Sequence, residues 1–247
     1  MKNQINKKRL FVFGDSWAFN YFSTYNKIYP DVKPHFGLTQ IQTYVKYYNN
    51  FGHWLDYIDP FFDVYSYGLG GISNEQIIWQ LSNLPEYMDG DRIIIIFTGV
   101  ERYTWVHEKK RYTFAAGSHY PDVILDKKYR DFFKRQYVER YEYWLDNPNN
   151  NFDFEKKFLN TFPSYFKKYN PICVTWRKEL SDQIESIDLL DFENYNLSTI
   201  TDETNKLYID GHLGAVGNYE LFRYFANRLE VNIGNLIDIK KFEKQLL

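Results

Sequence analysis

The stretch Asp91–Phe97, which contains four consecutive isoleucines, constrains the fold of this chain more than any other. Such a run leaves little room for a solvent-facing side, so it predicts a strand buried on both faces, as in the centre of a parallel sheet. A second apolar run, Leu10–Phe13, ends at Gly14 and predicts another buried strand that stops at a tight turn. Together the two runs favour an α/β domain.

The remaining segments alternate between strand and helix patterns. Further strands are expected at Phe61–Tyr67, Pro171–Thr175 and Ile187–Phe192, and helices at Gln40–Tyr48, His53–Ile58, after Ser73, near Leu180 and within Gly211–Leu229. Ser73 is followed three residues later by Gln76, which is the pattern of a capping box at a helix start. This alternation of strands and helices favours a mostly parallel sheet.

The chain has 247 residues and a mass of 29.9 kDa, and we expect one domain over residues 1–247. Residues 103–169, rich in aromatic and charged side chains, are predicted to form a helical insertion with helices at about 126–145 and up to about 168. It could serve as a lid or an oligomer surface, but an ordinary core-packing hairpin is favoured. Residues 235–247 are expected to form an amphipathic tail that packs either on the body or on a second copy of the chain, as in a homo-oligomer.

Charge and composition argue against several classes of function. The formal net charge of −2 gives no electrostatic case for nucleic acid or for an anionic membrane. The single cysteine, Cys173, is expected to be an inert buried thiol. The apolar stretch near the N-terminus is too short for a signal peptide, and no stretch approaches the length of a membrane span.

Aromatic residues make up 20% of the chain. Tyrosine offers an apolar face and a polar tip, so these rings could form sugar-stacking surfaces. A genome whose codon bias favours phenylalanine and tyrosine explains the same composition, and we favour that explanation.

The polar residues Asp15 and Ser16 directly follow the first predicted strand. Open α/β sheets bind their ligands at this carboxyl edge. A serine in this place can be a nucleophile if a base lies beside it. Asp and Ser are also common helix N-caps, so this stretch alone leaves both interpretations open.

A candidate base lies near the other end of the chain, in Asp210-Gly211-His212. An imidazole oriented by a carboxylate is what a serine needs to lose its proton at neutral pH. The same three residues could also form only a turn and a cap. The other four histidines have no partner at metal-ligand spacing and are expected on the surface or in loops, and no glycine loop has dinucleotide-binding spacing. The sequence therefore implies no metal and no cofactor.

These two ends of the chain resemble the first and last blocks of the SGNH (GDSL-like) hydrolases. Two stretches between them fit the order of that family: Gly68–Asn74, and Thr98–Arg102. The resemblance implies a three-layer, flavodoxin-like, doubly wound parallel sheet. It also implies that Ser16 is the nucleophile, His212 the base and Asp210 its orienting acid. Gly71, Asn74, Glu101 and Arg102 would then line the oxyanion hole and the substrate site.

The third block departs from the family, because Glu101 stands where an asparagine donor is usual. Glu101 could be protonated by burial and donate a hydrogen bond, could turn away and pair with a cation, or could mark a site that has lost hydrolysis. We favour the ion pair, because an unpaired buried carboxylate is costly. The variant blocks look most like SGNH-type proteins encoded by phages, so a cytoplasmic or virion-associated location is expected.

The resemblance implies a serine hydrolase that cleaves an ester, with O-acyl groups such as acetyl on a carbohydrate as the substrate class. The alternative is a binding or structural protein that keeps the hydrolase fold without turnover. Glu101 in the donor position is the feature that supports this alternative.

Overall fold

The computed structural model describes residues 7–15, 17–18, 53–68, 72–84, 86–99, 102–107, 110–115, 169–182, 184–190 and 215–233. A five-stranded, all-parallel sheet forms the centre of this part of the chain. Its strands are β1 (Lys8–Gly14), β2 (Phe62–Ser66), β3 (Arg92–Phe97), β6 (Ile172–Thr175) and β7 (Asp188–Leu189), in the spatial order β2-β1-β3-β6-β7.

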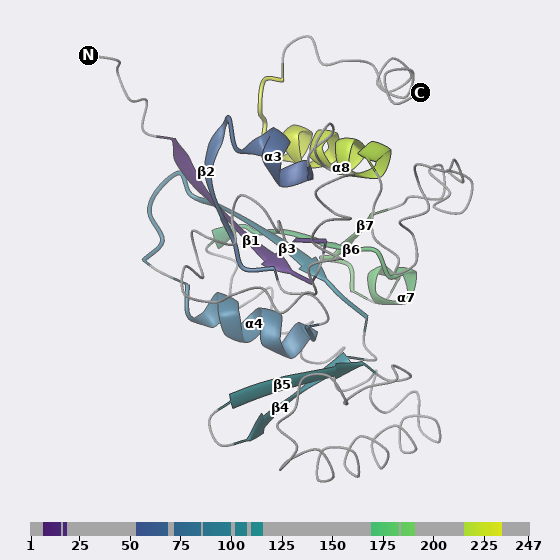
Figure 1. Ribbon diagram of the computed structural model, residues 1–247. Coiled ribbons are helices and arrows are strands. Elements are labelled where there is room, and N and C mark those ends of the chain that lie inside the picture. The colour runs from purple at the N-terminus through teal and green to yellow at the C-terminus, as the bar shows by residue number, and fades with distance from the viewer. Residues whose placement is uncertain are drawn as a thin grey trace, which may run out of the picture.

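Helices cover both faces of the sheet, as Figure 1 shows. The first face carries α3 (Trp54–Ile58) and α8 (Ala215–Arg228), which pack against each other. The second face carries α4 (Asn74–Ser82) and the short α7 (Lys178–Ser181). The protein is therefore an α/β protein with a parallel sheet between two helical layers, and the predicted strands and the helices at α3, α4, α7 and α8 are confirmed.

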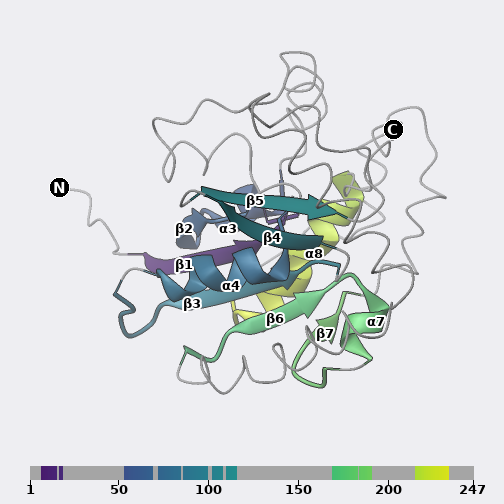
Figure 2. The same ribbon diagram turned by 90° about the horizontal axis from the view of Figure 1, so that it is seen from below.

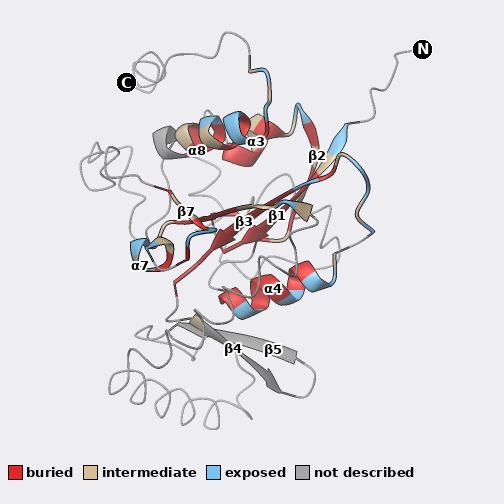
Figure 3. Ribbon diagram, turned by 180° about the vertical axis from the view of Figure 1, so that it is seen from behind, coloured by how far each residue is buried: buried red, intermediate tan, exposed pale blue. Residues whose placement is uncertain are grey.

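The double burial of the central strands follows from their alternating side chains. On β1, Leu10 and Val12 pack with the α3–α8 layer, whereas Phe11 and Phe13 pack with the α4–α7 layer. The isoleucines of β3 divide in the same way, and Ile94, Ile95 and Ile96 are all 0% exposed. Buried colour fills these strands and the inner faces of α3 and α4 in Figure 3. The run of isoleucines thus forms the buried parallel strand that the sequence predicts.

The strands of the sheet end in register. Gly14 of β1 lies opposite Ile96 of β3, and Phe97 of β3 lies opposite Thr175 of β6. The Thr175 hydroxyl donates to the Phe97 carbonyl at 3.1 Å, which ties the ends of β3 and β6 together. The segments that follow these strands therefore start from one common edge of the sheet.

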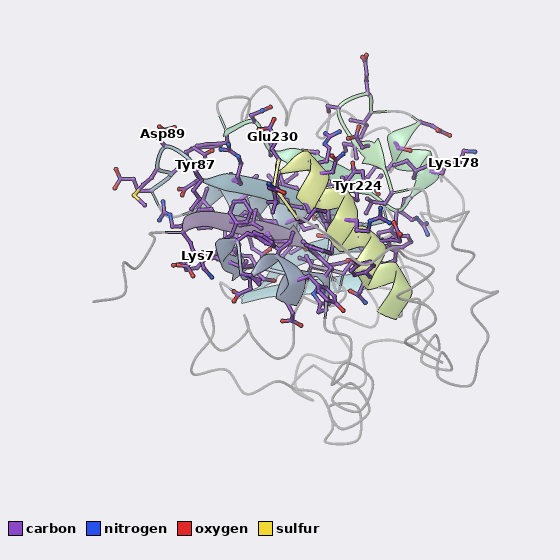
Figure 4. All side chains as sticks on the ribbon, turned by 90° about the horizontal axis from the view of Figure 1, so that it is seen from above. Lys7, Tyr87, Asp89, Lys178, Tyr224 and Glu230 are labelled. Atoms are coloured by element: carbon purple, nitrogen blue, oxygen red, sulfur yellow. The ribbon has the colours of Figure 1, made fainter. Side chains whose placement is uncertain are left out.

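A charged pair closes the opposite, amino edge of the sheet. Arg9 on β1 donates to Asp91, which precedes β3, through Nε at 3.0 Å and Nη2 at 2.5 Å. Burial alone would raise the pKa of Asp91, but the bonds from Arg9 and from the Met88 amide outweigh it and lower that pKa. Figure 4 shows Lys7, Tyr87 and Asp89 gathered at this edge, and Lys178 at the opposite side.

His53 is buried, at 9% exposed, although the sequence analysis placed it on the surface or in a loop. It is the N-cap of α3, and its Nδ1 accepts from the Leu55 amide at 3.3 Å. Asp56 completes a capping box by accepting from the His53 amide at 2.8 Å. The histidine is therefore held as a capping residue, in a position where Ser or Asp is more usual.

The predicted helical insertion begins with strands that the sequence analysis did not predict. β4 (Arg102–His107) and β5 (Lys110–Ala115) pair as antiparallel strands, ahead of the helices predicted at 126–168. The hairpin lies beyond α4, on the side away from the sheet (Figure 1, Figure 2). Its alternation of aromatic and β-branched residues is a strand pattern that the overall composition of the segment obscured.

Several predictions fall on residues outside the described ranges. They are the helix at Gln40–Tyr48, the helices within 126–168 and the tail at 235–247. The single-domain assignment over 1–247 likewise stays a prediction. Within the described ranges, no helix combines the length and the apolar character needed to cross a bilayer.

Gly14, at the end of β1, generates the first testable prediction. Its φ is +157°, and an added Cβ would lie 2.9 Å from both the Ala18 Cβ and the Ile96 carbonyl oxygen. The Ile96 carbonyl belongs to the rigid central strand and cannot give way. We expect Gly14→Ala to lower the free energy of unfolding in urea by about 1–3 kcal/mol, the usual cost of overpacking. An unchanged urea midpoint would contradict this expectation, because it would show that the space around residue 14 accommodates a Cβ.

Candidate active site

The turn after β1 is fixed on both sides of Ser16. The Ala18 amide donates to the Asp15 carbonyl at 3.0 Å, and the Trp17 amide donates to the Asp15 carboxylate at 3.0 Å. Asp15 and Trp17 are also buried, at 1% and 7% exposed. Ser16 itself lies outside the described residues, but its two chain neighbours are both held in place at the carboxyl edge of the sheet.

The Asp15 carboxylate is the centre of a polar network at this edge. One oxygen accepts from the Trp17 amide, and the other accepts from the Thr98 hydroxyl at 3.1 Å and from Arg102 Nη1 at 3.0 Å. Thr98 follows β3 and Arg102 begins β4, so one buried carboxylate joins three segments of the chain. The ion pair with Arg102, whose side chain is 17% exposed, compensates for the burial of this charge.

Asn74 connects the start of α4 to the end of β3. Its amide nitrogen donates to the Thr98 carbonyl at 3.0 Å, and its amide oxygen accepts from the Thr98 N–H at 2.8 Å. The side chain is 0% exposed. These contacts give Asn74 a positioning role for the loop after β3.

The N-terminus of α4 lies at the same carboxyl edge. Ser73 is its N-cap and accepts from the Gln76 amide at 3.3 Å, as predicted. The reciprocal half of a capping box is absent, because Gln76 Oε1 has no hydrogen-bond partner. The Ser73 hydroxyl also bonds Thr104 Oγ1 at 2.6 Å, and the Thr104 amide donates to Glu75 at 3.0 Å. The start of α4 is therefore attached to β4, the strand that carries Arg102.

Trp54 connects the turn after β1 to the first turns of α8. Its indole N–H donates to the Trp17 carbonyl at 2.7 Å, and its amide donates to Asn218 Oδ1 at 3.2 Å. All three residues are buried. Asn218 lies six residues after His212, and Trp17 directly follows Ser16. The segment after the predicted base and the segment after the predicted nucleophile therefore meet at a single residue, the first through its backbone amide and the second through its side chain.

An aromatic stack lies at the same edge. The rings of Trp17 and Trp176 are stacked, with centroids 5.6 Å apart, and the Arg177 guanidinium lies 5.0 Å from the centroid of the Trp176 ring. The Arg177 amide donates to Thr175 Oγ1 at 3.1 Å, which fixes the turn after β6. The Trp176 indole N–H is buried and has no hydrogen-bond partner.

Of the seven predicted site residues, the structure describes Asn74 and Arg102 and brings both to the Asp15–Thr98 network. The other five lie outside the described residues, namely Ser16, Gly71, Glu101, Asp210 and His212. Their predicted roles stay predictions. No group of three or more His, Cys, Asp or Glu side chains within the described ranges is arranged to hold a metal ion.

Sequence reasoning missed three contributors to this edge. Asp15 was expected at the carboxyl edge or as a cap, but its partner Arg102 lies 87 residues away, so no local pattern signals the ion pair. Trp54 joins residues 37 positions before it and 164 positions after it in the sequence. The Trp17–Trp176 stack likewise links the ends of two strands far apart in the sequence.

Cys173 on β6 is buried, as predicted. Burial, with a smaller contribution from the Asp188 carboxylate, raises the pKa of its thiol to about 12. A thiol with such a pKa is protonated at neutral pH, so Cys173 is no nucleophile there.

Comparison with known proteins adds no family assignment. No family model matches the chain, and no curated protein matches it.

Asn74 generates the second testable prediction. Asn74→Ala leaves the buried N–H and carbonyl of Thr98 without their side-chain partner, and each unsatisfied buried group costs about 1–3 kcal/mol. We expect the free energy of unfolding in urea to fall by about 2 kcal/mol or more.

The matched control is Asn83→Ala, because Asn83 is the exposed C-cap at the other end of α4 and its side chain donates to the Trp79 carbonyl of its own helix. Equal and small losses in the two variants would contradict a positioning role for Asn74.

Proposed function

We propose that this protein is a serine hydrolase that cleaves an ester at the carboxyl edge of the sheet. Ser16 is the nucleophile, His212 the general base and then the general acid, and Asp210 orients the imidazole. The resemblance to SGNH hydrolases carries the substrate class, O-acyl groups on a carbohydrate. A cytoplasmic or virion-associated location belongs to the same proposal.

The Trp54 bridge is the observation that best supports this function. Trp54 binds Trp17, the neighbour of Ser16, through its indole N–H and Asn218 of α8 through its backbone amide. His212 lies three residues before Ala215, the first residue of α8, and three residues of chain span at most about 10 Å. Figure 1 shows that α8 begins on the side of the molecule where the strands end. This tether supports the proposal that His212 lies within reach of the turn that contains Ser16.

The strand order supports the proposed fold family. Numbered along the chain, the sheet strands lie in the order 2-1-3-4-5, which is the order of flavodoxin-like folds. In such folds the ligand binds outside the carboxyl ends of the strands on either side of the point where the order reverses. Here that point lies between β1 and β3, and the hydrogen bond from Thr98 to Asp15 crosses it.

In the proposed reaction, the Ser16 hydroxyl oxygen attacks the ester carbonyl carbon while its proton passes to His212. The resulting oxyanion collapses, the carbon–oxygen bond to the alcohol breaks, and the alcohol leaves with the proton from His212. Water, deprotonated by His212, then hydrolyses the acyl-serine. The backbone amides of Ser16 and Gly71 stabilise the oxyanion. The N-terminus of α4, whose N-cap Ser73 lies two residues after Gly71, also favours negative charge.

Glu101 supports a second candidate, a binding protein with the same fold and no turnover. The interpretation favoured from the sequence is a different one, in which Glu101 pairs with a cation and the loss of hydrolysis is not required. Arg102 is the nearest cation in sequence, but its Nη1 is bound to Asp15.

Labelling with a fluorophosphonate probe tests the two candidates. An activated serine forms a bond from Oγ to phosphorus, and fluoride leaves. We expect one labelled residue, identified as Ser16 by peptide mass spectrometry. We also expect Ser16→Ala to abolish labelling and to lower ester turnover by about a thousandfold or more, with little change in melting temperature.

Ser82→Ala is the control, because Ser82 is an exposed serine at the end of α4. We expect this variant to be labelled at Ser16 to the same extent as the wild type. A wild-type protein that binds carbohydrate without labelling would support the binding protein. A Ser16→Ala variant that keeps its activity but loses stability would show that Ser16 is a helix cap and not the nucleophile.

A further inference from the structure

We propose that Arg102 is a positioning residue for Ser16 and acts through the Asp15 carboxylate. The inference rests on the proposed hydrolase function and gives Arg102 a positioning role in place of the substrate-lining role that the sequence predicts. Arg102 neutralises a buried charge directly beside the nucleophile and holds the turn that presents it.

The contacts of Asp15 define what Arg102 stabilises. The carboxylate is 1% exposed and directly precedes Ser16 in the chain. It binds the amide of Trp17, directly after Ser16, so its orientation controls the backbone on both sides of the serine. Thr98 supplies only a neutral hydroxyl, whereas Arg102 supplies a permanent positive charge.

Arg102 is itself well placed for this role. Its amide donates to the Gly99 carbonyl at 3.4 Å, and Thr104, two residues further along β4, bonds both Ser73 and Glu75 at the start of α4. The first residues of β4 are thus attached to α4 near the loop that contains Gly71. The guanidinium reaches Asp15 from a fixed strand rather than from a free loop end.

The chemistry explains why this charge matters for the reaction. Acylation places negative charge on the substrate oxygen, next to the backbone amide of Ser16. An unpaired carboxylate one residue away would oppose that charge and raise the free energy of the transition state. With Arg102 in place, the Asp15–Arg102 pair is neutral, and the amide N–H of Trp17 stays oriented by the carboxylate.

The chain offers a matched control at the opposite edge of the sheet. Arg9 and Asp91 also join β1 to the β3 side, with side chains 20% and 3% exposed, against 17% and 1% for Arg102 and Asp15. Both are arginine–aspartate pairs with nearly the same burial, although Arg9 binds Asp91 through two nitrogens and Arg102 binds Asp15 through Nη1. Only the Asp15–Arg102 pair adjoins Ser16.

The experiment compares Arg102→Gln, Arg9→Gln and the double variant Asp15→Asn/Arg102→Gln in the full-length chain. The two readouts are the urea unfolding midpoint and the rate of fluorophosphonate labelling at Ser16, followed across pH. Both single variants should unfold at lower urea. Arg102→Gln should label about 100-fold more slowly than the wild type, the usual cost of disturbing an oxyanion site, whereas Arg9→Gln should label at the wild-type rate.

The double variant keeps the test decisive if Arg102→Gln does not fold. It has no unpaired buried charge, and an asparagine at position 15 can still accept from the Trp17 amide. We expect it to fold and to label within about tenfold of the wild type, because neutralisation at Asp15 accounts for most of the effect. A folded double variant that does not label would overturn the proposal that Arg102 acts through Asp15.

Two other outcomes separate the inference from the proposed function. If the wild type labels and folded Arg102→Gln labels equally fast, or if Arg9→Gln slows as much as Arg102→Gln, the positioning role is wrong while the hydrolase stands. If the wild type does not label at all, the hydrolase function fails, and the positioning role fails with it.

Discussion

Burial of the parallel sheet on both faces is the constraint on which the rest of this structure depends. The side chains of β1 and of β3 alternate between two apolar layers, so helices must cover both faces of the sheet. Parallel strands covered in this way end at one edge, and the segments after them gather there. The placement of Thr98 and Arg102 within hydrogen-bonding distance of Asp15 is a consequence of that arrangement.

The edge is stabilised by side chains that each connect distant segments. Asp15 joins the turns after β1 and β3 to β4, Asn74 joins α4 to β3, and Trp54 joins α3 to α8 and to the turn after β1. Buried polar groups of this kind are costly when unpaired, so each partner restricts where the others can lie. Such a fixed frame suits chemistry that needs donors in place before charge develops. It is also consistent with a rigid binding surface, which is why labelling rather than geometry distinguishes the two candidates.

The sequence predicted the features that depend on local pattern. The isoleucines of β3 could only be buried on both faces, and the serine before α4 had the right spacing for a cap. It did not predict the Asp15–Arg102 pair or the Trp54 bridge, because contacts between residues 37 to 164 positions apart leave no periodic signal. The β4–β5 hairpin was missed for a different reason, since its strand alternation was present but the segment was included in an insertion that was interpreted as helical from its residues 126–168.

The central claim is that the two ends of the chain meet at the carboxyl edge of the sheet to form one catalytic centre. A crystal structure of the full chain measures this directly, through the distance from Ser16 Oγ to the nearer ring nitrogen of His212. The account predicts about 3–4 Å, with the Asp210 carboxylate at the other ring nitrogen. Ser16 and His212 on opposite faces of the sheet would contradict it.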